Sequence, residues 1–289
     1  MPTPSLATLP IRRLTPRDLA VCADLSENRG WPREEHKWGL LLAAGRGYGI
    51  DDPDGGLVSA CVVTSYGPQE RPDLAAIGMV LVAERHARQG VGRRLMQHVV
   101  AALGTTPLTL HATPYGRPLY EGLGFKTTGR AEMVRGHFTP GGSEPEALTR
   151  AATAEDLPAI LRLDQEVFGT DRTHMITRLP AFADQLRVAE EDGRITGYAA
   201  AWPNMDNQVV GPLIAQNTET AKELIASLAA HTTTHALRTD IDVRHEELLT
   251  WVKARGLASA GFNAVMTYGI PELPGDWTRR FAPLTVAAG

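Results

Sequence analysis

The sequence is poor in cysteine and has no long apolar run. Its two cysteines, Cys22 and Cys61, form no CxxC pair and no disulfide framework. That usage is typical of a reducing compartment and favours small buried side chains over nucleophiles. The longest uncharged stretches are interrupted by Pro, Gly, Gln or His, and the start "MPTPSLATLPIRR" lacks the apolar core of a signal peptide. We therefore expect a cytoplasmic protein with no membrane segment.

Positive charge is also scarce. Lysine and arginine total 29 against 33 aspartate and glutamate residues, so the net charge is −4. This balance disfavours nucleic acid and anionic membranes as partners. A hydrophobic content of 43% is ordinary for a soluble globular protein, and 289 residues are enough for two domains, each with its own core.

An internal repeat divides the chain into two halves. Four pairs of positions match in the same order at nearly constant spacing: Asp18 with Asp156 (156 − 18 = 138), Gly55 with Gly193 (193 − 55 = 138), Gly78 with Gly211 (211 − 78 = 133) and Gly124 with Gly261 (261 − 124 = 137). Between the halves lies "TPGGSEPEA", whose Gly, Pro and Glu content is typical of a linker. We predict domains at 1–140 and 148–289, joined by a linker at 141–147.

Each half has the pattern of an α/β domain, with the order strand, helices, hairpin, strand, helix, strand, helix and strand. Thr15 is expected to cap the first helix, with Pro16 at its first position. Apolar residues recur every four positions in 91–103, which predicts an amphipathic helix. "RPLYEG" predicts a short helix, and a closing hairpin is expected from Phe125 onward. The fold class is a mixed sheet flanked by helices.

The stretch "ERHARQGVGRRLM", residues 84–96, has the features of an anion-binding turn. It links an apolar strand to the start of a helix, where free N–H groups and the helix dipole attract negative charge. Gly90 and Gly92 allow close approach to the backbone, and Arg88, Arg93 and Arg94 add charge at the rim. Neither a P-loop nor a dinucleotide fingerprint fits, because no Lys-Ser or Lys-Thr follows the glycines and Leu95 replaces the third glycine.

Two motifs resemble those of the GCN5-related N-acetyltransferases (GNAT). "VLVAERHARQGVGRRLM" is similar to their acetyl-CoA signature, and "RPLYEGLGF" to their later tyrosine-containing segment. The resemblance implies two tandem GNAT-like domains, each a mixed, mostly antiparallel sheet flanked by helices. It also implies that acetyl-CoA is held by the strand residues Val80, Leu81 and Val82 and by the turn residues Arg88, Gln89, Gly90, Val91, Gly92 and Arg93. The sequence departs from the family at Ala87 and Thr113, which implies weaker cofactor affinity.

The same resemblance implies roles near the reacting groups. Tyr120 occupies the position of the acid that protonates the CoA thiolate, and a backbone N–H near Val80 that of the oxyanion donor. The acceptor side would include Trp31, Glu34, Glu35 and His111. The alternatives for the general base are His111, one of the two glutamates or a water chain, and none is preferred.

The second half has lost these features. "QNTETAKEL" replaces the glycine-rich turn, and Glu219 and Glu223 bring negative charge where phosphates would lie. We therefore expect a degenerate GNAT-like domain. His231 and His235 have helical i, i+4 spacing, but without a third ligand they do not predict a metal site. No metal and no cofactor other than acetyl-CoA are expected.

The predicted function is direct acetylation of the primary amine of a small molecule. Acidic residues at Glu34, Glu35 and 51–54 would suit an aminoglycoside-like or polyamine acceptor, although 51–54 also fit an ordinary turn. Acetylation of a protein N-terminus or lysine is an alternative, and a non-catalytic acyl-CoA-binding sensor is another. The sequence does not determine the oligomeric state.

Overall fold

The computed structural model describes residues 5–139, 149–232, 234 and 236–289. In the first half the strands are β1 (Ile11–Leu14), β2 (Arg46–Asp51), β3 (Leu57–Tyr66), β4 (Leu74–Val82), β5 (Leu108–Ala112) and β6 (Lys126–His137). The helices are α1 (Leu19–Asn28), α2 (Glu35–Ala44), α3 (Val91–Leu103) and α4 (Arg117–Glu121), with short 3₁₀ helices η1 (Pro16–Asp18) and η2 (Glu84–His86). The predicted linker at 141–147 lies outside the described residues, and the division into two domains stays a prediction.

The second half repeats this order. Its strands are β7 (Thr149–Ala151), β8 (Gln185–Glu191), β9 (Arg194–Asn204), β10 (Asn207–Ala215), β11 (Ala236–Asp242) and β12 (Leu257–Tyr268), followed by β13 (Arg280–Ala282). Its helices are η3 (Ala154–Asp156), α5 (Leu157–Phe168), α6 (Thr173–Ile176), α7 (Leu179–Phe182), α8 (Thr218–Ala230) and α9 (Glu246–Ala254).

Local signals in the sequence produce the predicted helix boundaries. Thr15 caps η1, its hydroxyl accepting the N–H of Arg17 at 3.3 Å, and Pro16 follows at the first position. Pro fits there because the first N–H of a helix has no partner in any case. The helix predicted at 91–103 is α3, Val91–Leu103. Gly45 is the C-cap residue of α2.

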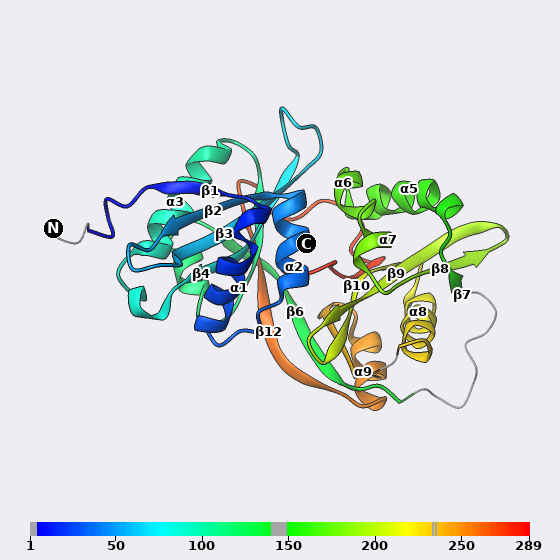
Figure 1. Ribbon diagram of the computed structural model, residues 1–289. Coiled ribbons are helices and arrows are strands. Elements are labelled where there is room, and N and C mark those ends of the chain that lie inside the picture. Colours follow the sequence, from blue (N-terminus) through cyan, green and yellow to red (C-terminus); the bar gives the residue numbers. More distant parts are fainter. Residues whose placement is uncertain (1–4, 140–148, 233, 235) are drawn as a thin grey trace.

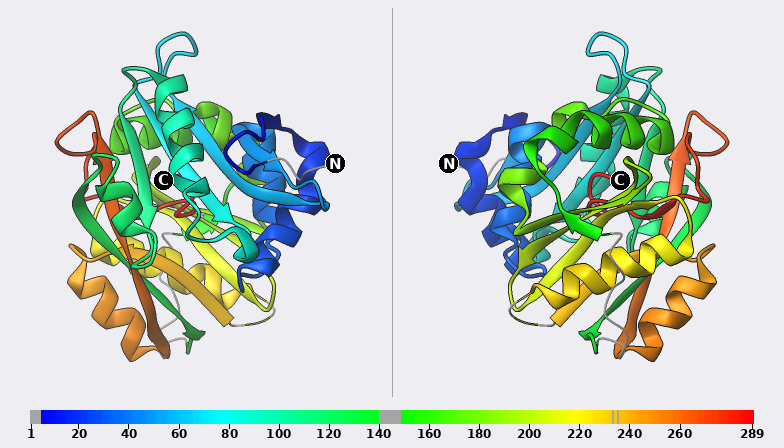
Figure 2. Two further views of the ribbon diagram at one scale, coloured as in Figure 1. Left: turned by 90° about the vertical axis from the view of Figure 1, so that its left-hand side faces the viewer. Right: turned by 90° about the vertical axis from the view of Figure 1, so that its right-hand side faces the viewer.

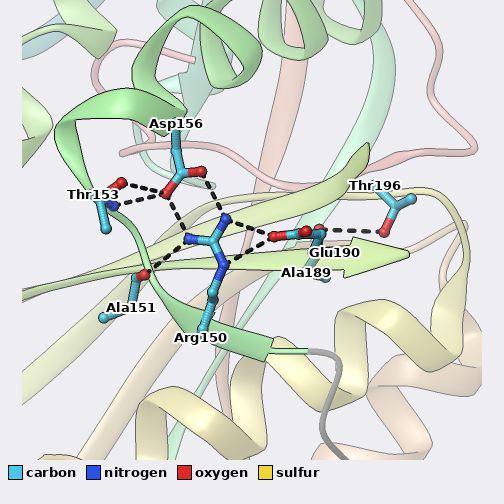
Figure 3. Close-up of polar contacts among 7 residues, drawn as sticks. All are labelled: Arg150, Ala151, Thr153, Asp156, Ala189, Glu190 and Thr196. Atoms are coloured by element: carbon cyan, nitrogen blue, oxygen red, sulfur yellow. Dashed lines mark hydrogen bonds and ion pairs between the residues drawn. The ribbon is translucent and has the colours of Figure 1, made fainter. Parts of the chain in front are cut away.

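An arginine clamp that occurs once in each half confirms the internal repeat in three dimensions, and Figure 3 shows the clamp of the second half. Arg150 of β7 donates to Asp156, before α5, and to Glu190 at the end of β8, at 2.6 Å in each case. In the first half Arg12 donates in the same way to Asp18 and Asp51, at 2.7 Å. Arg12 and Arg150 are separated by 150 − 12 = 138 residues, the offset of the sequence repeat. Each clamp ties the first strand of its half to the first helix and the second strand.

The two halves share one sheet because their last strands are exchanged. The strand order is β1-β2-β3-β4-β5-β12-β6-β11-β10-β9-β8-β7, with β13 also paired to β10. Thus β12 of the second half lies beside β5, and β6 of the first half lies beside β11 (Figure 1). The closing hairpin predicted from Phe125 onward is therefore wrong, because β6 is one long strand whose partners both come from the second half.

One apolar core is common to both halves. It joins buried residues of α1 and α2, such as Leu25 and Trp38, to residues of α5 and α6, such as Phe168 and Met175. A second core lies under α8 and α9, on the other face of the second half (Figure 2). The two halves are therefore packed as one body.

The C-terminal segment 283–289 runs between the halves, where Figures 1 and 2 place the end of the chain at the centre of the molecule. The Tyr66 hydroxyl of β3 donates to the Ala288 carbonyl, and Arg172 donates to the Gly289 carbonyl at 2.9 Å. Trp202 of β9 donates to the Leu284 carbonyl at 3.3 Å. Side chains from both halves therefore hold this segment in place.

Two further expectations concern burial and membranes. Cys22 and Cys61 are both free and buried, and burial raises the pKa of each thiol to about 12, which keeps it protonated. In the described part of the chain, no helix has the length and apolar character needed to cross a membrane.

We predict that Gly78→Ala destabilises the protein. A methyl carbon at Gly78 of β4 would lie 2.5 Å from the Cβ of Ala287 and would also meet the Ala287 backbone. Overpacking of this kind typically costs about 1–3 kcal/mol. The free energy of unfolding, measured by denaturant titration, should fall accordingly.

Gly39→Ala in α2 is the matched control, because its methyl group would have no neighbour within 4 Å. It should stabilise the protein by about 0.5–1 kcal/mol through helix propensity. Equal effects of the two substitutions would contradict the packing of 283–289 against β4.

Candidate active site

The candidate site begins where β4 leaves β5. Within the described residues, the two parallel strands pair at two positions, Ala75 with Leu108 and Ala76 with Thr109. Beyond them β4 is irregular: its register with β3 shifts, and Met79 adopts a left-handed φ of 53°. The segment Val80–Val82 therefore runs on without β5 as a partner, as the resemblance implied for a strand that binds an extended ligand.

The turn after β4 presents the start of α3 without a side-chain cap. Arg88 and Gly90 have left-handed φ values of 60° and 79°, and Gly90 is the N-cap residue. In the described part of the chain no side chain accepts the first N–H groups of α3. Arg88, Gln89 and Gly90 are exposed. An uncapped helix start with its positive dipole end is a suitable anion site.

Asp52 holds this turn in place. Its buried carboxylate, in the turn between β2 and β3, pairs with Arg85 and with His86 Nε2 at 2.6 Å. Burial alone would raise the pKa of Asp52, but hydrogen bonds from Arg85, the Asp54 N–H and His86 outweigh it and lower the pKa. The Asp51 carboxylate also has a structural partner, because it forms an ion pair with Arg12. These carboxylates are thus part of the scaffold.

The three rim arginines differ in their contacts. Arg94 donates to the carbonyls of Leu6 and Leu9, at 3.1 and 2.5 Å, and so fixes the segment before β1. Arg93 donates to the Gly122 carbonyl at 3.1 Å, which joins α3 to the end of α4. Among the described residues, no acceptor or carboxylate pairs with the guanidinium of Arg88. Its charge is therefore available to a ligand.

Two other turn residues expected to hold acetyl-CoA, Val91 and Gly92, also contribute to packing. Val91 is buried at the start of α3, with Val82 packed against the same small apolar cluster. A Cβ at Gly92 would lie 3.3 Å from Val82 and 3.5 Å from Leu119, whereas a Cβ at Gly90 would meet nothing within 4 Å. Gly92 is thus required for close packing, and Gly90 opens onto the space where a ligand would lie.

Tyr120 lies on the α3 side of the sheet. It belongs to the apolar cluster of Ile77 and Ala112, and Val80 packs against that cluster. The ring is 7% exposed and contacts Phe125 edge-on, with 6.0 Å between the ring centroids. Burial raises the pKa of the phenol well above its ordinary value of 10.0, so the group stays protonated. It can therefore donate a proton.

His111 lies on the opposite face of β5, because side chains alternate along a strand and Leu110 and Ala112 face α3. It hydrogen-bonds the backbone of Val286 in the C-terminal segment. Burial, reinforced by the positive charge of Arg280, lowers the pKa of His111 to about 4, so the imidazole is neutral at neutral pH. β5 thus separates His111 from Tyr120, the candidate base from the candidate acid.

The residues expected on the acceptor side are placed differently from one another. Glu34 is buried, pairs with Lys37 and lies 3.8 Å from Arg238 of β11, so it belongs to the contact between the halves. Glu35 pairs with Arg33 at 3.1 Å on the surface, and Trp31 is 38% exposed. The loop that carries Trp31 is close to the turn after β4, because Asn28 accepts the Glu84 N–H at 2.8 Å.

The equivalent place in the second half is filled by protein. There β10 and β11 also pair at two positions, Gln208 with Leu237 and Val209 with Arg238. Beyond them β13 pairs with β10, bringing Ala282 opposite Leu213. The start of α8 is capped as well, because the Asn217 side chain accepts the Thr220 N–H at 2.9 Å. A strand and a cap thus occupy what the first half leaves open.

The structure offers no support for a metal site at the two histidines. His231 Nδ1 lies 2.8 Å from the Ser227 carbonyl, and His235 lies outside the described residues. In the ranges that the structure covers, no group of three His, Cys, Asp or Glu side chains is arranged to bind a metal.

Sequence reasoning missed the part that the C-terminal segment plays. The one available signal was the uncharged run "FAPLTVAAG" at 281–289, which is typical of a buried segment. Nothing in it indicated that Ala287 would pack against Gly78 of β4, or that Val286 would bond His111 of β5.

Comparison with known proteins agrees with this geometry. Residues 62–139 and residues 160–282 each match a family described as an acetyltransferase (GNAT) domain. The chain is 30% identical to the uncharacterized N-acetyltransferase YitH of Bacillus subtilis over 223 residues, which is 76% of this chain and 77% of that protein.

Solved structures share the whole fold. A putative acetyltransferase from Pyrococcus horikoshii superposes with a TM-score of 0.82 at 16% identity, covering 100% of this chain and 99% of that one. A tandem GNAT protein from the clavulanic acid biosynthesis pathway gives a TM-score of 0.64 at 14% identity, covering 91% of this chain and 99% of that one. At such identities the likeness concerns the fold alone.

Proposed function

The chain belongs to the GNAT acetyltransferases and is an acyltransferase enzyme, and from that premise we propose that its first half transfers the acetyl group of acetyl-CoA directly to the primary amine of a small molecule. The observation that carries the proposal is the difference between the halves. The uncapped start of α3 lies beside a strand that has left its neighbour, whereas α8 is capped and β13 fills the equivalent gap. Acceptors such as aminoglycosides or polyamines fit the proposal.

The residues present suit acetyl-CoA. The backbone of Val80–Val82 is free of β5 and can hydrogen-bond the pantetheine arm. The N–H groups of 89–93, with the free guanidinium of Arg88, can hold the pyrophosphate. Bound there, acetyl-CoA would supply a thioester whose acetyl carbon accepts the amine.

The proton balance assigns Tyr120 its role. The neutral amine nitrogen forms a bond to the acetyl carbon while the carbon–sulfur bond breaks. The nitrogen loses one proton to water or to one of the candidate bases, and the thiolate leaves poorly unless it gains one. The protonated phenol of Tyr120 can give its proton to that sulfur, since it belongs to the apolar cluster against which Val80 packs, and a proton from water then restores the phenol. A backbone N–H near Val80 would stabilise the negative charge on the carbonyl oxygen. The segment 283–289 and His111 bound the opposite face of β5.

We predict that the protein releases CoA thiol from acetyl-CoA when a small primary amine is added. Thiol release should be measured with a polyamine, an aminoglycoside and a lysine-containing peptide of matched charge. Turnover with the peptide alone would favour protein acetylation over the proposal. Acetyl-CoA binding by calorimetry without turnover on any amine would favour the sensor alternative.

We predict that Gly90→Val weakens acetyl-CoA binding while the protein stays folded. The side chain would enter open space at the start of α3, where the pyrophosphate is proposed to lie. Gly193→Val is the matched control, because Gly193 has a similar φ of 73° and is equally open, but lies in the turn between β8 and β9. Backbone strain should affect the stability of both variants similarly. Calorimetry should find the affinity for acetyl-CoA lowered in Gly90→Val alone. Unchanged affinity would exclude the turn at 88–93 as the pyrophosphate site.

We predict that Tyr120→Phe lowers kcat by about a hundredfold to ten-thousandfold, the usual range for a general acid, and leaves acetyl-CoA affinity nearly intact. Because burial raises the pKa of the phenol, the wild-type rate should not fall through loss of this proton below pH 10. Tyr48→Phe, another buried tyrosine of the same cluster, is the control and should keep its turnover. A Tyr120→Phe rate within about twofold of wild type would mean that another group protonates the thiolate.

A further inference from the structure

A cavity lies at the outer edge of the second half, away from the proposed active site. Its volume is ≈ 520 Å³, within the range of small-molecule sites. It is bounded by the chain from β7 to α5, by the segment from α7 into β8, and by His231 at the end of α8. Since β7 pairs with β8 from Ala189 to Arg187, the cavity begins where β8 extends past its edge partner.

Arg187 of β8 supplies a cation to this cavity. Its Nε is buried and has no hydrogen-bond partner among the described residues, and no ion pair to its guanidinium is found there. Burial lowers the pKa of Arg187, and no neighbouring carboxylate raises it again. Arg150 and Arg172, by contrast, pair with the carboxylates of Asp156 and Asp164. A partly buried guanidinium whose Nε lacks a partner is stabilised by a ligand that supplies an acceptor and a counter-charge.

The other walls are mainly apolar. Ala152, Leu157, Ile160 and Pro180 line one side. The polar lining residues besides Arg187 are Thr153, Asp184, Gln185 and His231. The Oε1 atom of Gln185 has no partner among the described residues, while Asp184 is exposed and accepts a hydrogen bond from Gln208 at 2.7 Å. The cavity thus offers one unsatisfied donor on Arg187, one unsatisfied acceptor on Gln185 and an apolar body.

We propose that this cavity binds a small organic anion, a carboxylate with an apolar portion, whose charge is neutralised by Arg187. The planar guanidinium matches a carboxylate geometrically, and the apolar wall would cover the remainder of the ligand. The site is separate from the turn after β4 and does not depend on the proposed acetyl transfer.

The test uses full-length protein and three probes of one shape observed by ¹⁹F NMR: 4-fluorobenzoate, neutral 4-fluorobenzamide and cationic 4-fluorobenzylamine. The benzoate should bind most tightly. Arg187→Met, which keeps an unbranched aliphatic side chain but removes the guanidinium and its charge, should weaken benzoate binding about tenfold or more. Because the charge it removes has no partner, this variant should melt no lower than wild type.

Two variants and one competition complete the design. Ala154→Trp should block the cavity, because Ala154 lines it and is exposed. Arg194→Met, at the exposed arginine that begins β9, should bind like wild type. Saturating acetyl-CoA should leave benzoate binding unchanged. The proposal is overturned if benzoate binds no better than the amide or the amine, if Arg187→Met binds like wild type, or if acetyl-CoA displaces the probe.

Discussion

The pairing of β6 with β12 is the constraint on which the rest of the structure depends. The two strands run antiparallel over their whole length, from Leu257 opposite Gly136 to Thr267 opposite Lys126. Each is the last long strand of its half, and each lies in the sheet of the other. Without β12, β5 would be an exposed sheet edge next to the candidate site. The second half is therefore part of the scaffold of the first half.

The exchange also determines where the C-terminal segment goes. β12 lies beside β5. The chain then returns to the second half, where β13 pairs with β10 in the gap beside β11. It then reaches the middle of the molecule, where Ala287 packs against Gly78 of β4. One continuous segment thus fills the gap of the second half and covers the face of β4 in the first. The difference between the two halves follows from this path, because within the described residues β13 fills the gap beside β10, whereas β4 beyond Ala76 has no partner strand on the β5 side.

Short-range signals made part of this structure predictable. Thr15 and Pro16, the apolar spacing of α3 and the glycines at 90 and 92 act within a few residues, so the sequence indicates the helix starts and the anion turn directly. The exchange of β6 and β12 has no such signal, because a strand's alternating pattern does not identify its partner. For the same reason the anchoring of the turn by Asp52, 32 residues before Glu84 (84 − 52 = 32), and of the N-terminal segment by Arg94 could not be predicted.

A buried charged cluster shows how the second half also positions the start of α2. Glu34 and Lys37 of the first half face Arg238 and Asp240 of β11. Burial lowers the pKa of Lys37 and raises that of Asp240, which shows that desolvation disfavours the charged form of both groups. Such clusters contribute little net stability but disfavour any other arrangement of the same surfaces. The start of α2, and with it the loop that carries Trp31 beside the turn after β4, is thereby fixed by a strand of the second half.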